Sequence, residues 1–169
     1  ISYQWRMIPS TNNCVVLYNS VSKDSLLYFD YQSKVFSKTK ILNRMGMEDS
    51  SSILEVIFTG NNYYLFTSNG LYRFDSTAKS FVWHLDLKRI GNFNYEFSPY
   101  LTYNDTLVVI GSKSGYLNIF NIRTGEEKLV YVNKKIPEEE LNDRGIYAIV
   151  KDNNGGIWMG TNSMGLIHY

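Results

Sequence analysis

A motif that recurs about every 45 residues constrains the fold of this 169-residue chain more than any other feature. It comprises the end of one strand, a polar turn and the start of the next strand. It is clearest at residues 29–36 (FDYQSKVF), 74–81 (FDSTAKSF) and 120–126 (FNIRTGE). Asp30 and Asp75 are 45 residues apart, and Asp75 and Asn121 are 46 residues apart. Short strands repeated at roughly 40 to 50 residues are typical of β-propeller blades.

The repeat predicts an all-β chain in which residues 1–169 form one partial β-propeller. Four blades are expected, with approximate limits at residues 1–43, 44–88, 89–133 and 134–169. Each blade should be an antiparallel meander of four strands, which in the second blade fall near residues 52–59, 62–68, 70–75 and 80–87. The last blade is expected to be incomplete, with three strands near residues 146–152, 156–161 and 165–169.

The turn residues support this division into hairpins. An Asp or Asn whose side chain can accept hydrogen bonds from the following backbone ends the third strand of three blades, at Asp30, Asp75 and Asn121. The pair Asn154-Gly155 suits a tight hairpin with positive φ angles. A glycine precedes the third strand at Gly70, Gly115 and Gly165, where a chain reversal favours a residue without Cβ.

Composition and charge argue against several classes of partner. Seventeen Lys and Arg against sixteen Asp and Glu give a net charge of +1, so no overall field favours nucleic acid or an anionic membrane. Cys14 is the only cysteine, and its apolar surroundings predict a buried structural thiol rather than a disulfide. No stretch approaches the roughly 18 apolar residues that a membrane span requires.

The innermost strand of each blade should be apolar on both faces, because a propeller blade lies between two others. In the last blade this predicts that Ile146, Ala148 and Val150 share one face and that Tyr147 and Ile149 share the other. Both faces of this strand are therefore expected to be buried.

Three tryptophans are candidates for either packing or binding. Trp158, in a second strand, is expected to lie in the core, because large aromatic side chains dominate buried area. The alternative for Trp158 is an exposed ring that stacks on a sugar. Trp83 lies in a fourth strand near the rim of the propeller, and Trp5 lies near the start of the chain. Each is expected either to make an exposed contact or to cover the edge of a sheet.

With the repeat in register, the last blade resembles the two-component regulator propeller repeat. The resemblance rests on Leu141-Asn142, Ile146-Tyr147-Ala148-Ile149, Asp152, Gly155, Ile157-Trp158-Met159-Gly160-Thr161 and Gly165-Leu166. The other blades keep the spacing but lose the Trp and most of the Gly. Lys151 stands where the family usually has an acidic residue, and Met164 stands where a second Gly is usual.

That family forms the extracytoplasmic sensing half of bacterial hybrid histidine kinases. The resemblance therefore implies a periplasmic propeller of more than four blades, followed in the parent protein by further domains and a membrane helix. The remaining blades and the downstream signalling domains of the parent chain are the partners that it implies for this segment.

The sequence contains no pattern for catalysis, for a metal or for a cofactor. The two histidines, His84 and His168, have no metal-ligand spacing, and no serine lies in Gly-x-Ser-x-Gly. Gly155-Gly156 lacks the lysine and the strand-to-helix context of a nucleotide-binding loop. A glycosidase needs two carboxylates about 5 to 10 Å apart across a cleft, which the sequence alone neither identifies nor excludes.

The loops that connect the blades are the expected ligand-binding region, because propellers gather them on one face. These loops span roughly residues 43–51, 88–96 and 133–145. Six of their residues carry planar donors or an aromatic face suited to a polar oligomer, namely Arg44, Arg89, Asn92, Asn94, Tyr95 and Arg144. Each could instead satisfy only the loop backbone and solvent.

The first hypothesis is a non-catalytic sensory segment of a periplasmic propeller that responds to an oligosaccharide, with the ligand favouring one arrangement of propeller and downstream domains. The alternatives are a propeller enzyme acting on polysaccharide, as a lyase or glycosidase, and a protein-binding scaffold. Self-association is also predicted, because four blades of a larger ring form an open arc with an exposed edge and exposed faces. A closed four-blade ring is the alternative, and would be a monomer.

Overall fold

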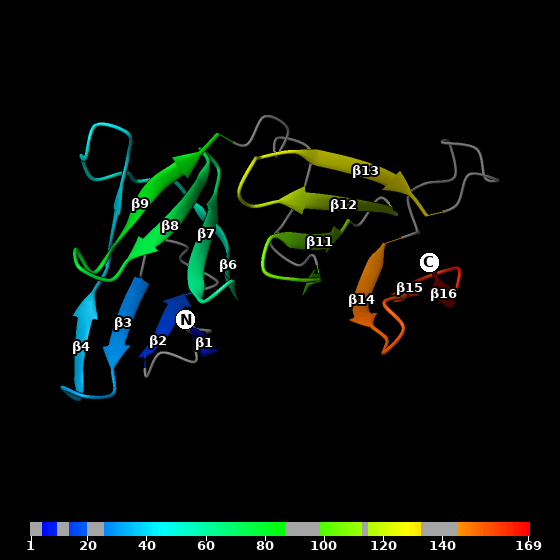
Figure 1. Cartoon of the computed structure of the whole chain (residues 1–169), viewed down its shortest axis with the longest axis horizontal. Helices are drawn as coiled ribbons and strands as arrows, with labels where there is room; N and C mark the ends of the chain where they lie inside the picture. The colour runs from blue at the N-terminus through cyan, green and yellow to red at the C-terminus, as the bar shows by residue number, and fades with distance from the viewer. Residues whose placement is uncertain (1–4, 10–13, 20–25, 87–98, 113–114, 133–144) are drawn as a thin grey trace. The chain divides into compact units, whose positions relative to one another are not determined.

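A computed structural model describes residues 5–9, 14–19, 26–86, 99–112, 115–132 and 145–169. Every regular element in these ranges is a β-strand, which confirms the predicted all-β class (Figure 1). The strands belong to two compact units, Ile1–Gly91 and Asn92–Tyr169, and each unit contains two sheets. Within the described ranges there is no helix of the length and apolarity that would be needed to cross a membrane.

The first unit contains two meander sheets. The first sheet is antiparallel and has the order β1 (Trp5–Pro9), β2 (Cys14–Asn19), β3 (Leu26–Asp30) and β4 (Val35–Lys38). The second contains β6 (Ile53–Thr59), β7 (Asn62–Thr67), β8 (Leu71–Asp75) and β9 (Ser80–Leu85), at the positions the repeat predicts. A fifth strand, which the sequence does not predict, is β5 (Lys40–Leu42), and it pairs parallel with β9.

The second unit repeats the architecture. Its first sheet has the order β10 (Tyr100–Thr102), β11 (Leu107–Gly111), β12 (Tyr116–Asn121) and β13 (Glu127–Tyr131). The fourth sheet of the chain has the order β14 (Ile146–Lys151), β15 (Ile157–Thr161) and β16 (Leu166–His168). The three strands predicted in the last blade are therefore confirmed, and all pairs in this unit are antiparallel.

The turns after the third strands have the predicted geometry. A side-chain oxygen accepts two backbone N–H groups at 2.8 to 3.2 Å in each of three blades, at Asp30, Asp75 and Asn121. Four residues further on, Lys34, Lys79 and Gly125 all have positive φ angles of 60°, 49° and 74°. A side chain is strained in this left-handed region, so of the three residues only the glycine meets the turn without that cost.

Each unit has a core between its two sheets. In the first unit the rings of Tyr28 on β3 and Phe74 on β8 stack with centroids 5.1 Å apart. Cys14 is buried in the same core, which confirms the predicted structural thiol. In the second unit Met159 on β15 packs in a core with Leu117 on β12. Burial of apolar surface between neighbouring sheets therefore stabilises both units.

The fourth sheet departs from the predicted pattern of faces. A β-bulge between Ile146 and Ala148 shifts the register of β14 against β15. As a result Ile146 and Ile149 are buried, whereas Tyr147 and Val150 are exposed. The prediction that Ile146, Ala148 and Val150 share a face is wrong, because the extra residue of a bulge reverses the alternation that follows it.

The shared turn geometry predicts unequal effects of the same substitution. Gly125→Ala should lower the free energy of unfolding by about 1 to 2 kcal/mol, because Ala is strained at a positive φ. Lys79→Ala is the matched control at the equivalent position of another blade. It should change stability by less than about 0.5 kcal/mol, because a side chain already occupies that conformation. Urea denaturation measures both, and equal losses would contradict a common turn.

Candidate functional site

Of the six predicted ligand-binding residues, the structure describes Arg44. The other five lie outside the described residues, namely Arg89, Asn92, Asn94, Tyr95 and Arg144. Arg44 lies between β5 and β6, in the first of the three predicted loops. The candidate site is therefore built around this loop.

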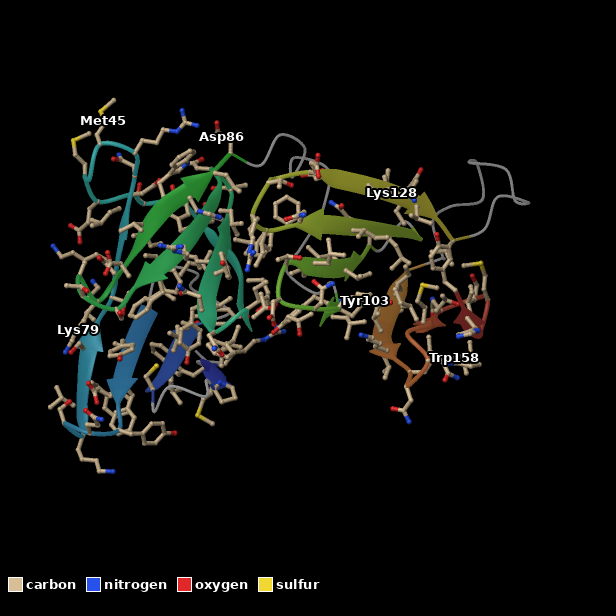
Figure 2. All side chains as sticks on the ribbon, viewed as in Figure 1. Met45, Lys79, Asp86, Tyr103, Lys128 and Trp158 are labelled. Atoms are coloured by element: carbon tan, nitrogen blue, oxygen red, sulfur yellow. The ribbon has the colours of Figure 1, made fainter. Side chains whose placement is uncertain are left out.

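The loop that carries Arg44 is held by hydrogen bonds to its own backbone. The Oδ1 atom of Asn43 accepts from the N–H groups of Met45 at 2.9 Å and Met47 at 3.1 Å. The backbone N–H of Asn43 donates to the carbonyl of Met47 at 2.8 Å. Met45 is 82% exposed and lies at the tip of the loop (Figure 2). The loop is thus a defined turn that projects from the sheet.

Asp49 anchors the end of the same loop to the second sheet. Its carboxylate accepts hydrogen bonds from Ser51 and from the Tyr72 hydroxyl on β8. Burial opposes the ionisation of Asp49, but the hydrogen bonds from Ser51 and Tyr72 outweigh it and lower the pKa of Asp49. Burial and the neighbouring carboxylate raise the pKa of Tyr72 to about 12. The anchor is therefore a charge-assisted hydrogen bond over the neutral pH range.

The side chain of Arg44 folds over the edge of the second sheet. Its guanidinium lies 4.0 Å from the centroid of the Trp83 ring on β9, and its Nη2 donates to Oδ2 of Asp86. A hollow of about 520 Å³ lies here, lined by Leu42, Asn43, Arg44, Gly46, Val82 and Trp83. A cation over an aromatic face is favourable, and the carboxylate balances its charge.

Sequence reasoning did not associate Trp83 with Arg44. The two side chains meet because the parallel pairing of β5 with β9 places Leu42 opposite Val82. A three-residue strand that pairs parallel leaves no periodic signal in the sequence. The two residues therefore appear at opposite ends of the predicted blade 44–88 until the pairing is known.

A second polar cluster lies on the fourth sheet. The Oδ1 atom of Asp152 accepts from the N–H groups of Asn154 and Gly156, each at 2.8 Å. Its Oδ2 atom accepts from Nε1 of Trp158 at 3.2 Å and lies 3.0 Å from Nε2 of His168. Slight desolvation opposes ionisation of Asp152, but the hydrogen bonds, led by those from Gly156 and Asn154, lower the pKa of Asp152.

Trp158 is not in the core, contrary to the prediction. Its side chain is 38% exposed, and its ring stacks on His168 with centroids 4.4 Å apart. The strand neighbours Ile157 and Met159 are buried instead, because they belong to the core cluster of this unit. Trp158 is therefore the exposed ring of the alternative prediction, with Val150 beside it across the strand pair and the polar side chains of His168 and Asp152 in contact with it.

Lys151, which departs from the resembled repeat, has a local structural role. Its Nζ donates to the carbonyl oxygen of Tyr103 at 3.1 Å and lies 4.2 Å from the centroid of the Tyr103 ring. The Tyr103 hydroxyl donates to the carbonyl oxygen of Gly155 at 2.9 Å. These contacts tie β14 and its hairpin to the neighbouring sheet, and an acidic side chain could make neither of the lysine contacts.

A buried carboxylate lies between the sheets of the first unit. Glu55 on β6 accepts from the Tyr18 hydroxyl on β2, from Nη1 of Arg6 on β1 at 3.0 Å and from the N–H of Val56 at 3.1 Å. Burial raises the pKa of Glu55 by more than the hydrogen bond from Tyr18 and the charge of Arg6 lower it. Among the described residues, no group of three or more His, Cys, Asp or Glu is placed to hold a metal ion.

The raised pKa of Glu55 predicts a pH-dependent stability. We expect the free energy of unfolding to fall as the pH rises above 4.5, the ordinary pKa of this group, until the pKa of folded Glu55 is passed. Over that interval the folded chain holds a proton that the unfolded chain has released. Glu55→Gln has no ionisable group at this position and should lack this slope.

Urea denaturation of both proteins between about pH 4 and pH 8 measures the effect as the difference between the two curves. Asp49 and Asp152 have lowered pKa values, so their contributions change only below their ordinary value of 3.8. Parallel curves for the wild type and Glu55→Gln would contradict the raised pKa.

The exposure of Trp158 predicts a small effect of its removal. Trp158→Ala should lower the free energy of unfolding by about 1 kcal/mol, the size of a stacking contact between two rings. Met159→Ala, at the next and fully buried position, should cost about 2 to 5 kcal/mol because it leaves a cavity. Thermal and urea denaturation compare the two variants. A larger loss of stability for Trp158→Ala than for Met159→Ala would show that Trp158 is buried in the core.

The chain is similar to several solved structures, which establish its fold. It aligns with the extracellular domain of BT4673 from B. thetaiotaomicron, described as a one-component or hybrid two-component system, at 23% identity and a TM-score of 0.60. The alignment covers 96% of this chain and 20% of that domain, so the chain spans a fifth of its length. No curated protein matches the sequence.

Other similar structures share less of the sequence. BamB from Moraxella catarrhalis aligns with 97% of this chain and 48% of its own length, at 16% identity and a TM-score of 0.62. The computationally designed Ika4 protein aligns with 96% of this chain and 88% of its own length, at 12% identity and a TM-score of 0.61. Residues 140–163 match the two-component regulator propeller family. The chain therefore has the fold of β-propeller blades and carries a two-component regulator propeller repeat in its last blade.

Proposed function

We propose that this chain is a non-catalytic, ligand-binding segment of the extracytoplasmic propeller of a two-component sensor. The observation that carries the proposal is the two-component regulator propeller repeat at residues 140–163. The similarity to an extracellular domain described as part of such a system supports a periplasmic location. In the parent protein, the remaining blades and the downstream signalling domains would be the partners of this segment.

The ligand class is a neutral glycan fragment, and the proposed contact is the hollow beside Arg44. A volume of about 520 Å³ lies in the range of roughly 300 to 1,000 Å³ that small-molecule sites occupy. Asp86 already balances the charge of Arg44, so a sugar with hydroxyl groups suits the site better than an anion does. The guanidinium can donate to hydroxyl oxygens, and the Asp86 carboxylate can accept from hydroxyl hydrogens.

The hollow also suggests how binding changes the segment. Its lining comes from the β5–β6 loop and from β9, so a ligand that contacts both would hold the loop against the sheet. A ligand shifts an equilibrium only as far as its affinities for the two states differ. The signal would then be a changed population of the arrangements of propeller and downstream domains, which feeds the phosphorelay of the parent protein.

A panel of neutral oligosaccharides tests the proposal by thermal shift and calorimetry. A glycan at 100 times its Kd should stabilise the chain by about 2.7 kcal/mol, which is a rise in Tm of about 5 to 10 °C. Arg44→Ala should weaken binding at least tenfold. Arg123→Ala, which removes an exposed arginine in the other unit, should leave binding unchanged.

Each remaining outcome has a separate meaning. Cleavage of any glycan by the chain would overturn the non-catalytic assignment and favour a lyase or glycosidase. Failure of every glycan to raise the Tm would favour a protein-binding scaffold. Binding that survives Arg44→Ala would keep the sensory role but remove the hollow as its site.

A further inference from the structure

A pocket lies between the two sheets of the second unit. It has a volume of about 270 Å³ and is lined by Tyr103, Leu107, Val109, Ile119, Ile157 and Tyr169. In this lining β11 and β12 belong to the third sheet and β15 belongs to the fourth, and both sheets lie within one unit. An apolar cavity of about 150 Å³ is enough to hold a benzene ring. The pocket therefore has room for one ring with a short substituent.

The repeat identifies the equivalent positions in the first unit. Tyr63 on β7 and Ile157 on β15 each lie four residues before the end of the strand. Their partners on the preceding strand are Phe58 and Lys151, respectively. In the second unit an isoleucine and a lysine therefore stand where the first unit has two aromatic side chains.

The third strands differ in a similar way. Tyr28 on β3 and Ile119 on β12 each lie two residues before the end of the strand. Phe74 and Tyr169 each lie three residues after the first residue of β8 and β16, respectively. Of the four ring positions in the first unit, the second unit thus keeps only the one at Tyr169.

In the first unit these four rings fill the space between the sheets. The centroid of the Tyr63 ring lies 5.0 Å from that of Phe58 and 6.0 Å from that of Phe74. Tyr28 stacks on Phe74 at 5.1 Å. The Tyr63 hydroxyl donates to the carbonyl oxygen of Ile8 on the first sheet at 3.0 Å. The two isoleucines of the second unit are smaller than tyrosine, so they leave the corresponding space open.

Lys151 places a positive charge beside this pocket. Its Nζ lies 4.2 Å from the centroid of the Tyr103 ring, which lines the pocket. One of the three donors of the ammonium goes to the carbonyl oxygen of Tyr103. Among the described residues, no carboxylate forms an ion pair with Lys151. Unlike Arg44, whose charge Asp86 balances, Lys151 can therefore bind an anionic group.

We propose that the pocket binds a small carboxylate with a single aromatic ring. The ring takes the space that Tyr63 fills in the first unit, and it packs on Tyr103 and Tyr169. The carboxylate lies at the mouth of the pocket and accepts a hydrogen bond from Lys151. This second site differs from the hollow beside Arg44, because it lies in the other unit and suits an anion rather than a neutral sugar.

Phenylacetate is the probe, because a single methylene group separates its ring from its carboxylate. A titration of the isotope-labelled 169-residue chain, followed by NMR, should give a Kd of about 1 mM or tighter. The amide signals that shift should include those of Ile119 and Ile157. Two matched compounds separate the parts of the ligand, since phenethyl alcohol lacks the charge and acetate lacks the ring. Each should bind at least about fivefold more weakly than phenylacetate.

Three substitutions test the geometry. Ile157→Tyr restores the ring of the first unit, so it should keep the wild-type circular dichroism spectrum and weaken phenylacetate binding at least about tenfold. Lys151→Gln should weaken the binding of phenylacetate but not that of phenethyl alcohol, whereas a loss of local structure would weaken both. Lys38→Gln removes an exposed lysine from β4 in the other unit and should change neither. If Ile157→Tyr does not fold, Ile119→Tyr fills the same pocket from the third sheet.

Three results would overturn the proposal. The first is that phenylacetate does not bind at about 10 mM. The second is binding that survives both Ile157→Tyr and Ile119→Tyr. The third is binding of phenylacetate that is no tighter than that of either matched compound. The test contains no glycan, so its result is independent of the proposed sensory role.

Discussion

The packing of one meander sheet on the next is the interaction on which the rest of this structure depends. The strand β2, which lies between β1 and β3 in its sheet, is buried along most of its length. The sheet must therefore contact apolar side chains from outside its own plane. Stacked rings such as Tyr28 and Phe74 supply that contact between sheets, and the second unit repeats it with aliphatic side chains. Because burial of apolar surface provides the main driving force for folding, a sheet without a neighbour leaves that stabilisation unrealised.

The candidate site depends on a smaller departure from this plan. The chain leaves the first sheet after β4, and the next strand, β5, pairs with β9 of the second sheet, which brings the following loop over the sheet edge. Arg44 and Trp83 then form one surface, although the repeat assigns them to opposite ends of a blade. Asn43 and Asp49 hold the two ends of the loop by hydrogen bonds, which fixes the position of the residues that line the hollow. A preformed site loses less conformational entropy on binding.

Much of the fold follows from short-range sequence signals, and the errors have long-range causes. The turns at Asp30, Asp75 and Asn121 were predictable because each depends on hydrogen bonds to the next three residues. The bulge in β14 was not predictable, because it depends on how two strands pair. Trp158 was misplaced because an alternating strand has two faces, and its sequence does not say which one meets a neighbour. Of the predicted ligand-binding residues, only Arg44 can be placed, and its contact with Trp83 required the tertiary pairing.

The sequence by itself determined the class of this protein: the period of its motif, its strands, its turns and the buried thiol of Cys14. These features depend on residues close together in the chain, where spacing and side-chain type are sufficient. Only the tertiary structure decided the parallel pairing of β5, the buried hydrogen bonds of Glu55 and the exposure of Trp158. These features depend on which strands pair and on which faces pack together. Residues that are close together in the chain do not specify either choice.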